Sequence, residues 1–193
     1  MKKLHKVLII DDHPVLCERY DELCDEVMKR NPQIRIKTEL AGNCDTAKEK
    51  INNTWSKGGL DLVILDIRLP PSKDRRILSG EDLGELIRKK HPLAKIIVAT
   101  TYNDNYRIQN IFKSFDPEGF LIKNDMSSIG FIEAIEKVLM GGKYCTSAVD
   151  DLMRKQALTE IRIDKLDRQI LYELSQGTKM KDLPKFVPLS MAG

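Results

Sequence analysis

Four short apolar runs of the chain end in residues that can take part in metal binding or nucleophilic chemistry. The runs are KVLII (6–10), LVIL (62–65), KIIVAT (95–100) and GFLI (119–122), and the residues at their ends are Asp11 and Asp12, Asp66, Thr100, and Lys123. Continuous apolar runs of this length are typical of strands buried on both faces of a parallel sheet. Because ligands of such a sheet bind beyond the carboxyl ends of its strands, we expect these side chains to meet at one edge.

The combination of three carboxylates, a hydroxyl and an amine predicts a metal-dependent acceptor of phosphoryl groups. Carboxylates brought close together repel one another unless a cation lies among them. Mg²⁺ (or Mn²⁺) prefers oxygen ligands and accepts phosphate oxygens beside them. Asp66 would then be the nucleophile, and Lys123 and Thr100 would contact the oxygens of the transferred group.

The elements that must position these residues alternate between strands and helices. A further strand is predicted at 34–40, and apolar side chains at helical spacing predict helices over 14–30, 45–55 (with Trp55 on its apolar face), 80–91, 104–115 and 127–140. Five consecutive strand–helix units predict the α/β class, as a doubly wound parallel (βα)5 sheet. The flavodoxin/CheY-like strand order 2-1-3-4-5 would place strands 1, 3, 4 and 5 side by side, and strand 2, which has no matching acidic residue, outside the cluster.

Composition and cysteine spacing exclude several other classes of protein. The 193 residues are 41% hydrophobic and 32% charged with a net charge of +3, which neither requires nor excludes a nucleic-acid partner. Cys17, Cys24, Cys44 and Cys145 form no CxxC pair, so we expect buried free thiols rather than a zinc or redox site. The first apolar run is too short for a signal peptide or a membrane span, and a cytoplasmic location is expected.

The motifs VLIIDDHP (7–14), LVILDIRLP (62–70), KIIVATTY (95–102) and GFLIKN (119–124) resemble those of the receiver domain of two-component response regulators. DDHP and the later GGKYCTSAV resemble the NarL/LuxR class. The resemblance implies phosphorylation of Asp66 by a sensor histidine kinase, and dimerisation upon phosphorylation. It also implies a role for each matching residue: metal ligands Asp11, Asp12, Asp66 and the backbone carbonyl of Arg68; the active-site lysine Lys123; the switch residues Thr100 and Phe120, which would turn inward; and modulators of phosphoryl lifetime Arg68 and Tyr102.

One segment departs from the receiver pattern. The resemblance implies a glycine about four residues after the proline of the loop that follows the acceptor. Here Gly80 lies well beyond Pro70, with residues 71–79 inserted between them. The insertion is either a solvated basic loop or a segment that shapes kinase recognition or access of water.

We expect a receiver domain over 1–146, a linker over 147–162 and a small helical output segment over 163–193. The last segment resembles the start of a LuxR-type helix-turn-helix, with a helix over 163–176 and a second, short helix capped by Thr178 and distorted by Pro184. A recognition helix would begin at about Ser190, where the sequence stops. DNA would therefore be a partner of the full-length protein but not of this incomplete chain. We expect that the chain has been cut short, the alternative being an output other than DNA binding.

Three other functions are weighed against a response regulator that controls transcription. Haloacid-dehalogenase-type phosphatases place a second Asp two residues after the nucleophile, where this chain has Arg68. A receiver-like interaction module with a non-DNA output typically loses one of the acids, the Thr or the Lys, all of which are present here. A flavodoxin-like cofactor binder needs a phosphate-binding loop after the first strand, where DDHP would repel phosphate. We expect a phosphoprotein without a membrane partner and without enzymatic turnover.

Overall fold

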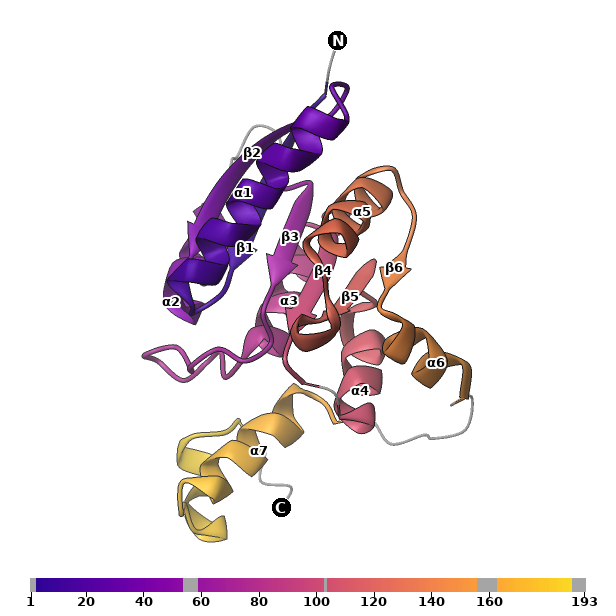
Figure 1. Cartoon of the computed structure of the whole chain (residues 1–193). Helices are drawn as coiled ribbons and strands as arrows, with labels where there is room; N and C mark the ends of the chain where they lie inside the picture. Colours follow the sequence, from indigo (N-terminus) through magenta and orange to yellow (C-terminus); the bar gives the residue numbers. More distant parts are fainter. Residues whose placement is uncertain (1–2, 54–58, 103, 156–162, 189–193) are drawn as a thin grey trace. The chain divides into compact units, whose positions relative to one another are not determined.

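The computed structural model describes residues 3–53, 59–102, 104–155 and 163–188, which belong to two compact units, Met1–Leu158 and Thr159–Gly193 (Figure 1). The first unit holds a parallel sheet in the order β2-β1-β3-β4-β5-β6. Its strands are β1 (Leu4–Ile10), β2 (Arg35–Ala41), β3 (Leu62–Leu65), β4 (Lys95–Thr100), β5 (Gly119–Ile122) and β6 (Tyr144–Cys145). The predicted order of the first five strands is confirmed. β6 was not predicted, because two residues are too few to show a strand pattern.

Helices cover both faces of the sheet, as the doubly wound fold requires (Figure 1). Side chains alternate along a strand, so β1 sends Val7 and Ile9 to one face and Leu8 and Ile10 to the other. One face packs against α1 and α5, the other against α2, α3 and α4. These helices are α1 (Pro14–Arg30), α2 (Cys44–Asn53), α3 (Gly80–Lys90), α4 (Asn105–Phe115) and α5 (Ser128–Leu139). Trp55 lies outside the described residues.

The N-termini of three helices are fixed by side-chain caps that lie close to the carboxyl edge of the sheet. Ser79 accepts a hydrogen bond from the Glu81 N–H at the start of α3, and Asp104 accepts one from the Arg107 N–H at the start of α4. Ser127 caps α5 in the same way. Such caps satisfy backbone donors that a helix cannot pair internally, and they fix where each helix begins.

The first unit extends beyond α5 to a further helix, α6 (Ser147–Lys155). Its Val149 and Leu152 side chains are buried in the same hydrophobic cluster as the residues of α2, α3 and α4. The first part of the predicted linker is thus a packed helix, whereas residues 156–162 lie outside the described part of the chain. Of the four cysteines, Cys145 is half-buried and the other three are buried, and all four thiols are free.

The second unit contains α7 (Lys165–Ser175) and the 3-10 helix η2 (Met180–Lys185). Asp164 and Asp167 form a capping box at the start of α7, and Gly177 ends it with a φ of +84°. The prediction that Thr178 caps the next helix is wrong, because its hydroxyl donates to Glu173 Oε2 at 3.0 Å. Pro184 lies inside η2, which is short and not α-helical. Ser190 falls outside the described residues. In the part of the chain that is described, no helix has the length and apolar character needed to cross a membrane.

Candidate phosphoryl-acceptor site

The predicted site residues converge at the carboxyl edge of the sheet. Asp11 follows β1 and Asp66 follows β3, and the register pairs the preceding residues Ile10 and Leu65. Lys123 follows β5, and its Nζ atom lies 2.7 Å from Asp11 Oδ2 and 2.6 Å from Asp66 Oδ2. The carboxylates of Asp11 and Asp66 are only 1% and 3% exposed. Two buried carboxylates that share one ammonium group lie in surroundings where an added cation is strongly attracted.

The acidic residues have the geometry of a divalent-cation site. Ligand atoms of Asp11, Asp12, His13 and Asp66 all lie within 4.8 Å of one another. Asp12 Oδ1 is buried and accepts no hydrogen bond, although His13 Nδ1 lies 2.9 Å away. A carboxylate whose buried oxygen accepts no hydrogen bond, clustered with the carboxylates of Asp11 and Asp66, fits a hard cation such as Mg²⁺. The backbone N–H of Arg68 donates to Asp66 Oδ1 at 3.0 Å, so the Arg68 backbone adjoins this cluster.

His13 belongs to this cluster but was not predicted as a site residue. Its ring nitrogen lies 3.2 Å from Asp11 Oδ1, and its backbone N–H donates to the same oxygen at 3.0 Å. The signal was present in the DDHP sequence, where His13 directly follows the two acids. Because Mg²⁺ favours oxygen over nitrogen ligands, we assign His13 a role in orienting the Asp11 carboxylate.

Burial and charge act in opposite directions on the ionisable groups of the site. Burial raises the pKa of Asp66 above its ordinary value, although hydrogen bonds from Lys123 and from the Arg68 N–H partly oppose this rise. For Lys123, burial acts to lower the pKa, but the hydrogen bonds to Asp11 and Asp66 outweigh it and the pKa is raised. Lys123 is therefore firmly protonated at neutral pH. It can donate to oxygens beside Asp66.

Gly80 supports the backbone of Asp66, the candidate acceptor, and this role was not predicted from the sequence. It begins α3, and its N–H donates to the Ile67 carbonyl at 3.0 Å. A Cβ atom at this position would lie 2.0 Å from the backbone oxygen of Asp66 and 2.8 Å from Ile67 Cα. Only glycine lets α3 pack this closely behind the acceptor. Gly80 therefore takes the place of the glycine that the receiver pattern expects, although the insertion moves it along the sequence.

The inserted segment 71–79 is anchored at both ends and exposed between them. Ser72 is buried, its N–H donates to the Ile77 carbonyl at 2.8 Å, and its hydroxyl donates to Asp74 Oδ1 at 2.6 Å. Ile77 is buried in the core, whereas the side chains of residues 73–76 are exposed. Hydrogen bonds from Ser72, the Arg76 N–H and Lys48 lower the pKa of Asp74. The insertion is a structured loop that leaves the packing of Gly80 on Asp66 intact.

Thr100 and Phe120 both lie inside the fold. Thr100 is fully buried at the end of β4, and its hydroxyl oxygen accepts a hydrogen bond from the Tyr102 N–H at 3.2 Å. The Phe120 ring is also fully buried, 5.5 Å from the Phe112 ring. The ring lies inward in this structure, where β6 pairs with the outer edge of β5 and α6 contributes to the same hydrophobic cluster. The switch role of Phe120 and its inward turn upon phosphorylation stay predictions.

Comparison with known proteins agrees with this geometry. The family described as the response regulator receiver domain matches residues 7–129. The chain belongs to this family. It is 25% identical over 189 residues to the transcriptional regulatory protein MctR of Rhizobium johnstonii, covering 97% of this chain and 80% of MctR.

Solved structures show the same fold at lower identity. The isolated REC domain of RcsB from Salmonella enterica serovar Typhimurium, with the phosphomimetic BeF3⁻, has a TM-score of 0.60 at 22% identity and covers 78% of this chain and 99% of its own. A structure of two RcsB dimers bound to two parallel DNAs has a TM-score of 0.61 at 20% identity, covering 95% of this chain and 82% of its own. The receiver fold is CheY-like, as predicted.

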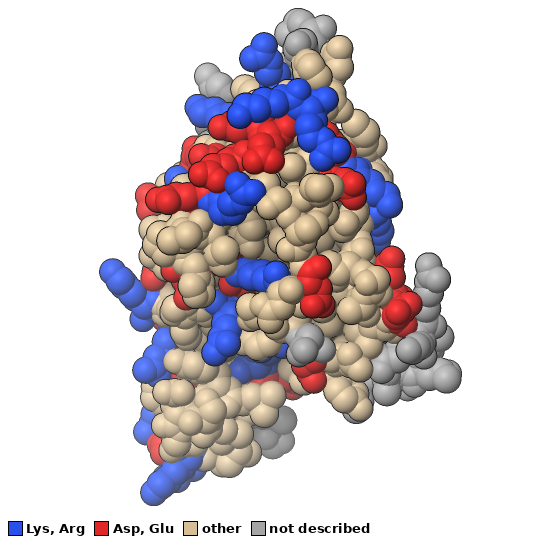
Figure 2. Space-filling model, viewed as in Figure 1, with Lys and Arg blue, Asp and Glu red and all other residues tan. Residues whose placement is uncertain are grey.

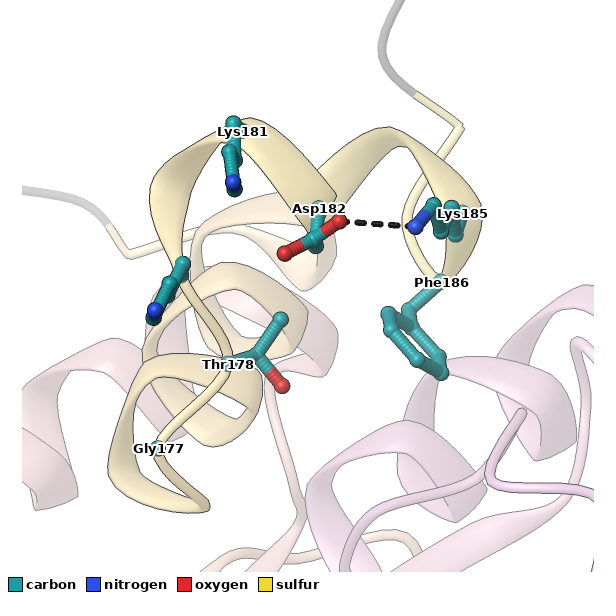
Figure 3. A pocket seen from close by; sticks show the side chains of 7 residues that line it. Gly177, Thr178, Lys181, Asp182, Lys185 and Phe186 are labelled. Atoms are coloured by element: carbon teal, nitrogen blue, oxygen red, sulfur yellow. Dashed lines mark hydrogen bonds and ion pairs between the residues drawn. The ribbon is translucent and has the colours of Figure 1, made fainter.

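The second unit carries a separate, open pocket. It is lined by Gly177, Thr178, Lys179, Lys181, Asp182, Lys185 and Phe186 (Figure 3). Lys185 pairs with Asp182 at 2.7 Å. The lining has more lysines than aspartates, but these lysines are spread along η2 and the residues before it. They do not converge on one point, as an anion-binding site would require. On the face seen in Figure 2, acidic side chains gather in a band in the upper part of the view, with basic side chains beside it.

Proposed function

We propose that the chain is the phosphoryl-accepting part of a two-component response regulator that controls transcription. The observation that carries the proposal is the bridge from Lys123 Nζ to Asp11 Oδ2 and Asp66 Oδ2, with Asp12 in the same cluster. The bridge joins the ends of three strands of one sheet, where an acceptor carboxylate, a cation site and a phosphate-binding amine are all needed together. Membership in the receiver family supports the same assignment.

Each residue has a distinct role in the proposed reaction. An oxygen of Asp66 attacks the phosphorus of a phosphohistidine on a sensor kinase, or of a small phosphodonor, and the leaving group departs with the electron pair of the broken bond. Lys123 then donates to an oxygen of the transferred group, and Thr100 does the same from β4. Asp11, Asp12, Asp66 and the carbonyl of Arg68 would hold Mg²⁺ (or Mn²⁺), which neutralises negative charge on the phosphoryl group when it is bound. The protein returns to its starting state by hydrolysis, without turnover of a separate substrate.

The output is proposed to be DNA binding by the full-length protein as a homodimer. MctR is a transcriptional regulatory protein, and RcsB dimers bind DNA in the structure to which this chain is similar. The sequence of the second unit supports a LuxR-type helix-turn-helix whose first helix is α7. Its second helix, η2, spans six residues. In a domain of this kind, a recognition helix in the major groove reads the bases.

A phosphatase of the haloacid-dehalogenase type is disfavoured by the structure. Such an enzyme needs a second carboxylic acid two residues after its nucleophile, and the Arg68 side chain at this position is exposed. The alternative of a receiver-like interaction module is less well supported, because Asp11, Asp12, Asp66 and Lys123 lie together at one edge of the sheet.

Intact mass after incubation with acetyl phosphate and Mg²⁺ tests the proposal. We expect one labile phosphoryl adduct on the wild type, and none on Asp66→Ala or in the presence of a chelator. Asp74→Ala is the matched control, because Asp74 is an exposed aspartate on the loop that follows the acceptor. An adduct that survives in Asp66→Ala, or no adduct on folded wild-type protein, would overturn the proposal.

A further inference from the structure

A partly buried ion pair links the start of α3 to the start of α4 beside the proposed acceptor. Arg107 Nε donates to Glu81 Oε1 at 2.7 Å, and the Glu81 side chain is only 6% exposed. The backbone N–H of Arg107 is held by the Asp104 cap, so the arginine has a fixed origin on α4. Charged groups are rarely buried without a structural or functional reason, since their desolvation is costly.

One end of this pair is tied to the acceptor residue. Glu81 directly follows Gly80, whose Cα packs against the backbone oxygen of Asp66. Its position is therefore fixed relative to the acceptor by backbone contacts, and it has little freedom to follow α4 if that helix moves.

The other end is tied to the switch hydroxyl. The Arg107 guanidinium lies 3.9 Å from the centroid of the Tyr102 ring. The Tyr102 N–H in turn donates to Thr100 Oγ1. Glu81, Arg107 and Tyr102 thus form a continuous connection, called here the brace, from the acceptor loop to Thr100. A Thr100 hydroxyl that moves toward a phosphoryl group on Asp66 leaves its position beside the Tyr102 N–H. The brace opposes that movement, because it holds the tyrosine in place.

We propose that Glu81 and Arg107 are positioning residues that stabilise the conformation in which the Thr100 hydroxyl accepts a hydrogen bond from the Tyr102 N–H. They thereby slow the phosphorylation of Asp66 until this hydrogen bond is broken. The inference rests on the proposed phosphoryl-accepting function of Asp66. Breaking the brace raises the population in which Thr100 faces Asp66. A small phosphodonor then reacts faster, because that population supplies the contact made in the transition state.

The chain contains a matched control pair. Arg88 and Glu118 also join α3 to a later segment at 3.2 Å, and both side chains are partly buried. Arg88 lies at the far end of α3, where it also donates to the carbonyls of Ala94 and Phe115. Glu118 Oε2 also accepts a hydrogen bond from the Ile96 N–H near the start of β4, at the end of that strand opposite to Thr100. Glu118→Gln therefore weakens a partly buried ion pair that does not contact Tyr102, and the amide oxygen of glutamine can still accept from Ile96.

Two measurements on the whole chain test the brace. The first is the rate of Asp66 phosphorylation by acetyl phosphate with Mg²⁺. We expect Glu81→Gln and Arg107→Lys each to raise it by about threefold to tenfold, within the range set by coupling energies of residues in contact. We expect the double variant to be no faster than the faster single variant, and Glu118→Gln to match the wild type. The second measurement is hydrogen exchange of the Tyr102 amide, which should be faster in both brace variants and unchanged in Glu118→Gln.

The outcomes separate the brace from the function on which it rests. If the wild type is phosphorylated and Glu81→Gln reacts at the same rate or more slowly, the brace is overturned while the acceptor assignment stands. If the wild type takes up no phosphoryl group, the proposed function fails. The restraint on Tyr102 is then decided by hydrogen exchange alone, and equal exchange in Glu81→Gln and wild type refutes it.

Discussion

Replacing Gly80 with alanine is the most direct test of how the acceptor residue is supported. The added Cβ would lie 2.0 Å from the Asp66 carbonyl oxygen, 2.8 Å from Ile67 Cα and 2.9 Å from the Asp66 carbonyl carbon. All three are backbone atoms, which cannot turn aside as a flexible side chain can. The start of α3 or the loop after β3 must therefore shift by roughly 1 Å or more to restore an ordinary van der Waals distance.

The magnitude follows from two opposing effects. Overpacking of a rigid site costs about 1–3 kcal/mol. Alanine recovers about 0.5–1 kcal/mol of backbone entropy relative to glycine in a helix, less at its first position. We therefore expect a net loss of about 1–2 kcal/mol in the free energy of unfolding of the first unit. In a domain of this size, that corresponds to a melting temperature lower by roughly 2–8 °C.

Urea unfolding monitored by circular dichroism measures the loss of stability, and intact mass measures phosphorylation of Asp66 by acetyl phosphate. Gly42→Ala is the control, because its Cβ would meet the Asp11 carbonyl oxygen at an ordinary 4.0 Å. We expect Gly80→Ala to be less stable and slower to react, since the shift displaces the acceptor, and Gly42→Ala to be close to wild type in both. A Gly80→Ala variant with wild-type stability would refute the argument from steric contact.

Three further predictions concern the charges and caps around the site. Asp66→Asn should raise the free energy of unfolding at pH 7 without Mg²⁺. The pKa of Asp66 is raised in the folded state, so its contribution to stability is present below pH 3.8 and is lost as the pH rises through the folded-state pKa. The difference in unfolding free energy between Asp66→Asn and the wild type, measured by urea unfolding, should vanish in acid. Asp104→Ala should cost about 1 kcal/mol of stability by removing the cap on the Arg107 N–H, and an unchanged unfolding midpoint would contradict the cap. Mg²⁺ at a hundredfold excess over its Kd should stabilise the wild type by about 2.7 kcal/mol in a thermal-shift titration, and Asp12→Asn should need a higher concentration for the same shift.

The convergence of the site was predictable from the sequence because it depends on topology alone. Asp11, Asp66 and Lys123 each follow a continuous apolar run, and parallel strands bring such positions to one edge whatever the loops contain. The first five strands and five helices were predicted for the same reason, since their apolar patterns have a clear period.

Contacts made between loops gave no such signal. The packing of Gly80 on the Asp66 backbone depends on how the insertion folds back, and the hydrogen bonds of Ser72 that close the inserted loop join residues with no periodic pattern. Glu81 and Arg107 are 26 residues apart in the sequence, so no local pattern indicates that they pair. Thr178 was expected to be a cap because of its residue type, but Glu173, five residues earlier, offers its hydroxyl a carboxylate acceptor.

The enclosure of Phe120 changes what a phosphorylation switch in this chain has to move. The Thr146 N–H donates to the Phe120 carbonyl at 3.0 Å, and Cys145 pairs with Phe120 in the β5–β6 register. On the other side, Phe112 of α4 stacks on the ring. The ring thus lies among side chains of α4, β5 and α6, so a displacement of Phe120 would require these elements to repack together. Because packed cores respond by discrete rearrangement rather than by gradual deformation, α6 would then move with α4.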